Sequence, residues 1–295
     1  MKIGVDGGGS KTELVLVDDQ GEVVQRHVAG GCNPNVIGAE AARRLLQDSL
    51  RTLTVGLPAG SISATLLCMA GNRVFWRETA EALSDYGRIA TTDDALPVLE
   101  LASDGGPGLV LHGGTGSFVA ARTADQRNPL GCLYAGGLGW RFGDPGSGYD
   151  ISRRAIGRGL LELQGWAPWS RIGPALQAHT SLKDTADITR YFYAHAEANR
   201  VIASLAPVIL NLAAEGDEAA REIVAASAGE LLELALQVAT TTFPDLPLDA
   251  LRAGLSGPVL THPFVIADLT PRSLLPLVPV TQAPIEGVRR LLRRL

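Results

Sequence analysis

The sequence predicts an α/β protein of two lobes, each with a mixed sheet flanked by helices. Three observations predict it. The chain has 295 residues, enough for two domains of ordinary size. Segments with strand-like and helix-like patterns alternate along it. A strand, a glycine-rich turn and a second strand open the chain, and the same pattern recurs about 107 residues later.

Composition fits a chain that buries real cores, because 46% of the residues are hydrophobic and 19% are charged. The net charge of −5 argues against nucleic-acid binding, and the arginines of 289–294 predict the solvated face of an amphipathic helix. Three cysteines without a CxxC pair predict neither a disulfide framework nor a metal site. We expect a soluble cytoplasmic protein, since no signal peptide and no apolar run near 18 residues is present.

The first lobe begins with three extended segments joined by a glycine turn and a polar turn, which predicts an antiparallel meander. Alternating helices and strands then follow. In order, the expected elements are strands 2–6, 12–17 and 22–29, helix 39–53, strand 61–69, helix 76–86, strand 88–91 and helix 95–102.

A linker rich in glycine at 103–108 predicts the lobe boundary. The predicted domains are 1–104, 105–284 and a terminal helix 285–295. The second lobe opens with another strand–turn–strand and is mostly helical beyond it. Its expected elements are strands 109–111 and 118–121, helices 146–164, 185–198, 201–214 and 217–240, and strands 249–255 and 277–280.

The first glycine turn carries groups that suit a phosphate. Its glycines let backbone N–H groups approach an anion, and its hydroxyls add donors. Asp6, at the strand end, is placed to hold a water of a bound Mg²⁺. Val5 and Ser10 exclude a P-loop, and Thr12 excludes a Rossmann fingerprint. A plain hairpin turn, with Lys11 facing solvent, stays open as the alternative. The candidate phosphate-binding residues are Gly7, Gly8, Gly9, Ser10, Lys11 and Thr12.

The second glycine turn has the same character and comprises Gly114, Thr115, Gly116 and Ser117. Two such turns, one from each lobe, can clamp a triphosphate with Mg²⁺ between them. Phosphoryl transfer then needs little more than a group that takes the acceptor's proton. Thr91-Thr92-Asp93-Asp94 supplies a carboxylate at a strand end. One aspartate caps the following helix while the other faces the cleft, or the reverse.

Four stretches carry a resemblance to a known family: DGGGSKTELVLVD, TTDDA, GGTGSFVAAR and GGLGWRFGDPGSGYDISR. The chain resembles the superfamily of sugar kinases, heat-shock ATPases and actin, in its branch of N-acetylglucosamine kinases and BadF-BadG-BcrA-BcrD-type ATPases. The resemblance implies a two-lobed actin-like ATPase (ribonuclease H-like) fold with an interlobe cleft. It also implies ATP and Mg²⁺ as cofactors, a terminal helix that returns to the first lobe, and a homodimer as a plausible state.

The resemblance further implies an activity and its residues. The activity is phosphorylation of an amino sugar at its 6-hydroxyl, with N-acetylglucosamine as the leading substrate. The aspartate before alanine in TTDDA matches the general base, which selects Asp94. Residues implied at the sugar are Asn33, Asp94, Thr115, Gly136, Asp144 and Gly148, and those implied at the adenosine are Gly254, Ser256 and Gly257.

Other functions stay open beside this one. Leu138 and Pro145 depart from the family's pattern beside the sugar, so glucosamine and N-acetylmuramic acid remain alternative acceptors. An iron–sulfur activator ATPase would carry a cysteine just before the second turn, where this chain has His112 and Gly113. A sugar sensor would carry a DNA-binding module ahead of Asp6. His112 is expected to be a buried structural histidine, and Trp166 and Trp169 are expected to cover a helix end.

Overall fold

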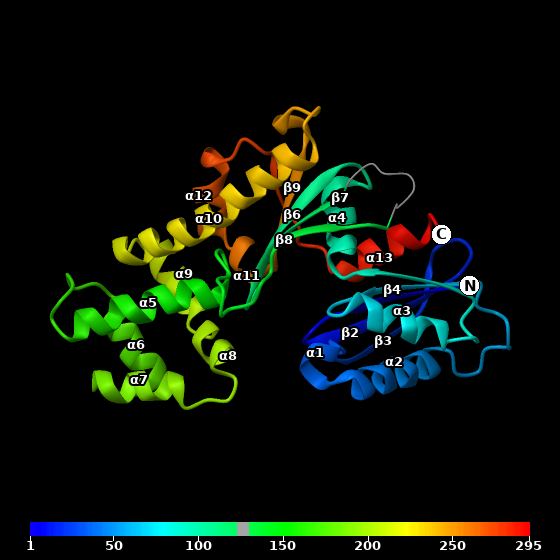
Figure 1. The fold of residues 1–295 in the computed structure, drawn as a ribbon, viewed down its shortest axis with the longest axis horizontal. Coiled ribbons are helices and arrows are strands. Elements are labelled where there is room, and N and C mark those ends of the chain that lie inside the picture. Colours follow the sequence, from blue (N-terminus) through cyan, green and yellow to red (C-terminus); the bar gives the residue numbers. More distant parts are fainter. Residues whose placement is uncertain (123–129) are drawn as a thin grey trace. The chain divides into compact units, whose positions relative to one another are not determined.

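The computed structural model describes residues 1–122 and 130–295. These residues divide into two units, each built around a five-stranded sheet (Figure 1). Unit 1 holds the sequence up to Pro107, and a short internal segment and the C-terminal end of the chain join it. The full assignment is Met1–Pro107, Arg122–Cys132 and Gln282–Leu295 to unit 1, and Gly108–Ala121 and Leu133–Thr281 to unit 2.

The sheet of unit 1 has the strand order β3-β2-β1-β4-β5. Strands β1, β2 and β3 form the predicted antiparallel meander, whereas β1, β4 and β5 run parallel to one another. The strands are β1 Lys2–Gly7, β2 Lys11–Val17, β3 Val23–Gly30, β4 Ala64–Met69 and β5 Arg88–Asp93. Each one falls close to a predicted segment, and buried β-branched and aliphatic residues dominate β1, β2 and β4.

Both faces of this sheet are covered, which explains why its central strands are apolar at nearly every position. Ile3 and Val5 share a core with buried side chains of α2 and α3. Gly4, between them, faces the other way, where an added Cβ would lie 2.6 Å from Val288 of α13. The helices of unit 1 are α1 Pro34–Ile37, α2 Ala39–Leu53, α3 Arg73–Glu81, α4 Ala95–Ser103 and α13 Pro284–Leu292.

Helix α3 begins three residues earlier than predicted. Asn72 is its N-cap, and the Oδ1 atom of Asn72 accepts hydrogen bonds from the N–H groups of Val74 and Phe75 at 2.9 and 3.1 Å. This satisfies two of the donors that a helix start leaves unpaired. The prediction of 76–86 missed that cap because it followed only the apolar residues.

The sheet of unit 2 repeats the strand order of unit 1. Its order is β10-β9-β6-β7-β8, so β6, the first strand in sequence, is central, with the next two strands on one side and the last two on the other. As in unit 1, the last two strands are parallel to the first. The strands are β6 Gly108–Gly113, β7 Ser117–Arg122, β8 Leu133–Gly136, β9 Arg252–Ser256 and β10 Leu277–Pro279. The recurrence seen in the sequence is therefore a recurrence of topology.

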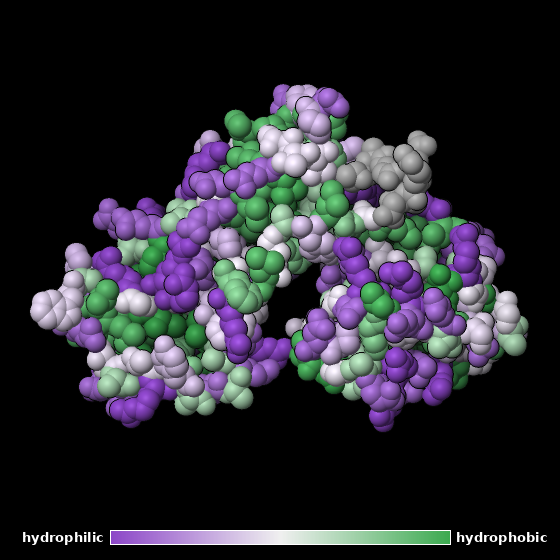
Figure 2. Space-filling model, in the orientation of Figure 1, coloured by the Kyte–Doolittle hydropathy of each residue, from purple (hydrophilic) through white to green (hydrophobic). Residues whose placement is uncertain are grey.

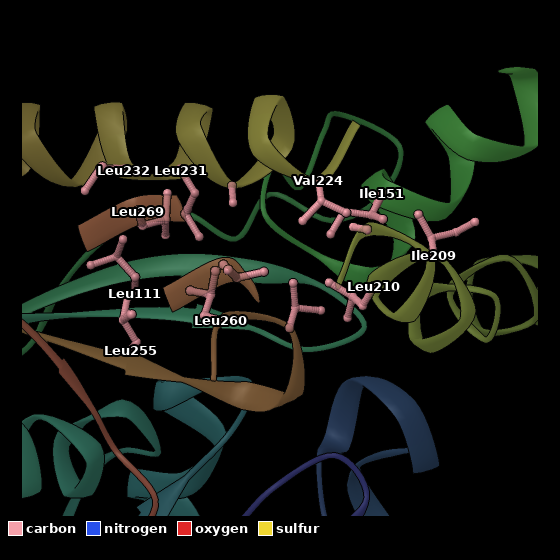
Figure 3. Close-up of a cluster of buried hydrophobic side chains, with 14 of the residues drawn as sticks. Leu111, Ile151, Ile209, Leu210, Val224, Leu231, Leu232, Leu255, Leu260 and Leu269 are labelled. Carbon is pink, nitrogen blue, oxygen red and sulfur yellow. The ribbon is translucent and has the colours of Figure 1, made fainter. Parts of the chain in front are cut away.

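Most helices of unit 2 share one apolar core with its sheet. Leu111 and Leu255 of the sheet, Ile151 of α5 and Leu231 of α10 belong to this core (Figure 3). The predicted helix 201–214 is two helices, because Pro207 lies in the first turn of a new one. The helices are α5 Gly148–Leu163, α6 Ile172–Thr180, α7 Thr185–Tyr193, α8 Ala198–Ala203, α9 Ala206–Ala214, α10 Glu218–Thr242, α11 Gly257–Leu260 and α12 Pro263–Leu269.

Two apolar segments differ from expectation, one by its length and one by its exposure. Helix α10 is long and apolar enough to cross a membrane by length and composition, but ten of its residues are buried in unit 2. Trp166 and Trp169 were expected to cover a helix end, and this was wrong, since they are 82% and 67% exposed. Figure 2 shows hydrophilic and hydrophobic residues mixed over the visible face.

Helix α13 approaches α4 so closely that Gly287 has no room for a side chain. A Cβ there would overlap the Pro97 carbonyl group, 2.6 Å from its carbon. We therefore expect Gly287→Ala to destabilise the protein by roughly 1–3 kcal/mol, because overpacking forces the helices apart. Gly157, on the exposed face of α5, is the matched control, since its Cβ would meet nothing within 4 Å. Gly157→Ala should be neutral or stabilising by about 0.5–1 kcal/mol. Urea denaturation measures both, and equal effects would contradict the account.

Candidate functional site

In unit 1, three parallel strands end at one edge of the sheet, and the candidate residues follow those ends. Gly7 of β1 is in register with Met69 of β4, which is in register with Asp93 of β5. The first glycine turn, Gly71 and Asp94 lie just beyond. In open α/β sheets the carboxyl ends of parallel strands are the usual place for a ligand.

The first glycine turn is tied to its surroundings but leaves open space at its tip. The Gly8 N–H donates to the Lys11 carbonyl at 2.9 Å, and the Cys32 N–H donates to the Gly8 carbonyl at 3.1 Å. At Gly7 a Cβ would lie 2.6 Å from Met69, whereas at Gly9 it would meet nothing within 4 Å. Neither a positive φ nor protein crowding requires glycine at position 9. A close ligand would explain it.

The side chains of this turn divide into engaged and exposed groups. The Thr12 hydroxyl is buried and donates to the Gly30 carbonyl at 2.8 Å, so it joins β2 to β3. Lys11 pairs with Glu13 at 2.8 Å, although over half of its side chain is exposed. Ser10 is exposed. The structure thus leaves Ser10 and Lys11 accessible to a phosphate and gives the Thr12 hydroxyl a structural partner instead.

Asp6 is a buried carboxylate in a negative environment. Burial, then the negative charge of Asp94, raises the pKa of Asp6 from its ordinary 3.8 to about 7, although Lys11 opposes the rise. Two carboxylates near each other suit a divalent cation. The described residues contain no group of three His, Cys, Asp or Glu able to hold a metal alone. A cation here would therefore take most of its ligands from water or a phosphate, as Mg²⁺ does.

The two aspartates after β5 have different surroundings. Asp93 is bound by Arg73, whose Nε donates to its Oδ1 at 2.6 Å. Asp94 occupies the N-cap position of α4, but its side chain makes no capping hydrogen bond. The charge of Asp94 instead acts on Asp6. Asp94 therefore makes no capping hydrogen bond to the helix that it precedes, and it lies close enough to Asp6 for its charge to act on that carboxyl.

Asn33 lies at the same edge of unit 1. It caps the short helix α1, with its Oδ1 accepting from the Asn35 N–H at 2.9 Å. A Cβ on Gly71 would lie 2.5 Å from this Oδ1, and Gly71 has a positive φ, so a glycine is required there. No hydrogen bond of the Asn33 amide nitrogen is found among the described residues, so this donor can serve a ligand.

The second glycine turn is built into the N-terminus of α5. The Gly148 N–H donates to the Gly114 carbonyl at 2.7 Å, and the Tyr149 N–H donates to the Thr115 carbonyl at 3.2 Å. The Ser117 hydroxyl is buried and donates to the Pro145 carbonyl at 2.6 Å. These bonds fix the turn, and they leave Ser117 a structural role like that of Thr12.

Asp144 lies against this turn and has an unused acceptor. A Cβ on Gly116 would be 3.1 Å from its Oδ2. The residue is 4% exposed, and its Oδ1 has no hydrogen-bond partner among the described residues. Burial raises the pKa of this carboxyl, although a hydrogen bond from the Gly139 backbone opposes the rise. A buried oxygen without a partner is costly, so a ligand hydroxyl is a fitting partner. Gly136, which has a positive φ, ends β8 nearby in sequence.

The end of β9 lies beside the same turn. A Cβ on Gly257 would overlap the Gly113 carbonyl group, and Gly257 has a positive φ. His112 Nδ1 lies 3.0 Å from the Ser256 hydroxyl, and burial lowers the pKa of His112 to about 4. His112 is thus the neutral structural histidine that was expected. Gly254 lies inside β9, paired with β6 and β10, which places it within the sheet rather than at a turn.

A cavity of about 290 Å³ opens beside the second glycine turn, within unit 2. Gly114, Thr115 and Gly148 form one wall, and α8, α9 and the α11–α12 connection form the rest. Sequence reasoning missed the polar residues of those helices, because no motif joins them: they are Arg200, Ser204, Asn211 and His262. The lining is otherwise apolar, as expected for a site that takes a flat base and its sugar.

Two sheets of the same topology, each with a glycine turn at its carboxyl edge, are typical of the actin-like ATPase fold. Comparison with known proteins makes the assignment specific. Residues 3–243 match the model of the BadF/BadG/BcrA/BcrD ATPase family, so the chain belongs to that family. The predicted membership is confirmed, and the chain is an ATP-using enzyme.

Individual relatives agree with this. An N-acetylmuramic acid/N-acetylglucosamine kinase from Clostridium acetobutylicum is 28% identical over 240 residues, which are 78% of this chain and 76% of the relative. A solved structure from Chromobacterium violaceum, provisionally named an N-acetylglucosamine kinase, is 25% identical with a TM-score of 0.75, covering 99% of this chain and 98% of the other. A ROK family glucokinase from Streptomyces griseus, solved with glucose and AMPPNP, is 13% identical with a TM-score of 0.56, covering 98% and 97%. That last likeness concerns the fold alone.

Because Asp6 is buried, replacing its carboxyl by a neutral amide should increase the free energy of unfolding, and the increase should depend on pH. Because its pKa is higher in the folded than in the unfolded chain, the stability that this group contributes is full below about pH 4. It is lost as the pH rises through 7. Asp6→Asn should therefore match the wild type near pH 4 and exceed it at pH 8 by roughly 1–4 kcal/mol.

Urea denaturation of the ligand-free protein at several pH values tests this. Asp48→Asn is the control, because Asp48 is an exposed residue of α2. Its difference from the wild type should not grow with pH. A constant or shrinking advantage of Asp6→Asn would contradict the proposed burial of charge.

Proposed function

We propose that the protein is an ATP-dependent amino sugar kinase that transfers the γ-phosphoryl group of ATP to the 6-hydroxyl of N-acetylglucosamine. The proposal rests on the position and the surroundings of Asp94. It follows the end of a parallel strand, it holds the N-cap position without a capping hydrogen bond, and its charge acts on Asp6. A carboxylate so placed is suited to accept a proton from an attacking hydroxyl.

Unit 2 would bind the nucleotide. The cavity beside the second glycine turn has the size and the largely apolar lining of a base and ribose site. N–H groups of the turn would face the phosphates, and the dipole of α5 would favour negative charge nearby. The first N–H groups of α5 itself are engaged within the protein. Ser256 and Gly257 support this turn from β9.

Unit 1 would bind and activate the sugar. Asp94 would accept the proton of the 6-hydroxyl as the oxygen attacks the terminal phosphorus. The Asn33 amide would donate to a sugar oxygen, since its own oxygen is engaged with α1. In unit 2, the Oδ1 of Asp144 has no partner among the described residues and would accept from a ligand hydroxyl, with Thr115 in the adjacent turn. Such paired donors and acceptors reject sugars that lack a hydroxyl, because a buried group is then left without a partner.

The residues fit a magnesium ion. Asp6 would hold it through water, and the bound ion would neutralise charge on the phosphates. With a pKa of about 7, Asp6 is about half-ionised at neutral pH, and a bound cation would favour its charged form. We further propose that the enzyme acts in the cytoplasm. The resemblance to the family also supports a homodimer.

A coupled assay for ADP formation across N-acetylglucosamine, glucosamine, N-acetylmannosamine, N-acetylmuramic acid and glucose tests the proposal. N-acetylglucosamine should give the highest kcat/KM. Preference for glucosamine or N-acetylmuramic acid would move the assignment to another acceptor. ADP formation that no sugar stimulates would contradict a kinase.

Loss of the carboxylate at position 94 should slow the chemical step. We expect Asp94→Asn to reduce kcat by about 10²–10⁴-fold, because general base catalysis contributes on that order. Binding of ADP, whose base and ribose would lie in the unit 2 cavity, should be unchanged within a factor of two. Asp48→Asn is the matched surface control and should retain full activity. Turnover of Asp94→Asn close to that of the wild type would remove Asp94 from the role.

Filling the unit 2 cavity should block the nucleotide and spare the fold. Ala203 lines the cavity from α8 and is only half-buried, so a larger side chain can extend into the open volume. We expect Ala203→Phe to weaken ADP binding by about 10-fold or more, as measured by calorimetric titration, because contact area with the base is lost. Ala226→Phe, at an exposed position of α10, is the control. Unchanged ADP affinity in Ala203→Phe would place the nucleotide elsewhere.

A further inference from the structure

Unit 1 has a second cavity that the proposed reaction does not use. Its volume is about 250 Å³, and it opens beside the end of β5. Met69 and the buried ring of Trp76 form an apolar wall, and residues 130–132 form another. The strand contributes Thr91, Thr92 and Asp93, but neither Asp94 nor Asn33 lines the space. The cavity is thus next to the proposed sugar site and separate from it.

The walls of this cavity are held by hydrogen bonds. Arg73 Nε donates to Asp93 at 2.6 Å, and Arg73 NH2 donates to the Cys132 carbonyl at 3.2 Å. The Thr92 hydroxyl donates to the Leu130 carbonyl at 2.6 Å. Asp93 is therefore neutralised by Arg73, and the site is built before any ligand arrives.

The lining of this cavity has one more positively charged side chain than negatively charged ones. Arg77 follows Arg73 by one helical turn on α3, so both arginines present the same face of the helix to the cavity. No hydrogen bond or ion pair of Arg77 is found among the described residues. The Thr91 hydroxyl likewise has no hydrogen-bond partner within residues 1–122 and 130–295. With two arginines and one aspartate, the lining carries a formal charge of +1.

We propose that this cavity binds an oxyanion, a carboxylate or a phosphate, carried by a sugar. Arg77 would bind it with its guanidinium, whose planar donors match two oxygens at once, and Thr91 would donate a hydroxyl hydrogen bond. The apolar wall of Met69 and Trp76 would contact the carbon frame of the ligand. The oxyanion has two possible sources, an acidic substituent of the substrate or the phosphate of a sugar phosphate.

Calorimetric titration of the full chain tests the site. The probes are N-acetylmuramic acid, which carries a carboxylate, N-acetylglucosamine 6-phosphate, and neutral N-acetylglucosamine as reference. Arg77→Gln should weaken binding of one anionic probe by about 10-fold or more, because a hydrogen bond to a charged group is lost. Its affinity for the neutral sugar should stay within a factor of two. Arg44→Gln, an exposed arginine of α2, is the matched control and should change neither.

The two sources give different results. A selective loss for N-acetylmuramic acid, with a parallel fall in its kcat/KM as acceptor, supports a subsite for an acidic substituent, and this arm rests on the proposed function. A selective loss for the sugar phosphate supports a site for the product or a related phosphate. If no sugar is phosphorylated but Arg77-dependent binding persists, the kinase proposal fails and the anion site stands. Equal affinities in Arg77→Gln and wild type, or no anionic probe bound by either, would overturn it.

Discussion

The direction of the strands is the constraint on which the candidate site depends. In each unit the strand that comes first in sequence is central and runs parallel to the two strands that come last in sequence, so their carboxyl ends meet at one edge. A glycine turn leaves the first of these strands in both units. Acidic residues follow at the ends of β1 and β5 in unit 1, and the β9 end supports the turn in unit 2. Residues distant in sequence, such as Asp6 and Asp94, are neighbours only because of this topology.

Burying charge at this edge opposes stability and serves binding. The folded chain keeps Asp6 near another carboxylate and away from water, and an oxygen of Asp144 has no partner in the part of the chain that the structure describes. Both arrangements cost free energy in the absence of a ligand. Buried polar groups without a partner are typical of functional sites, where the bound ligand supplies that partner. The neighbouring Asp93 shows the contrast, because Arg73 satisfies it within the protein.

Much of the fold could be predicted from the sequence, because long segments have a clear apolar period. The meander and the helix at 39–53 are confirmed for that reason. Errors arose where one polar residue or proline decides an end, as at Asn72 and Pro207. At the site, the glycine motifs indicated the turns, but they could not show that the Thr12 and Ser117 hydroxyls bind the backbone. The cavity residues of α8, α9 and α12 come together only through tertiary packing, so no local pattern marked them.

A crystal structure with N-acetylglucosamine and a non-hydrolysable ATP analogue tests the central claim most directly. The account predicts the analogue's phosphates at the Gly114–Gly116 turn with its base in the unit 2 cavity. It also predicts the sugar's 6-hydroxyl within about 2.6–3.2 Å of the Asp94 carboxylate. A sugar bound away from the carboxyl edge of the unit 1 sheet, or a nucleotide bound outside that cavity, would contradict it.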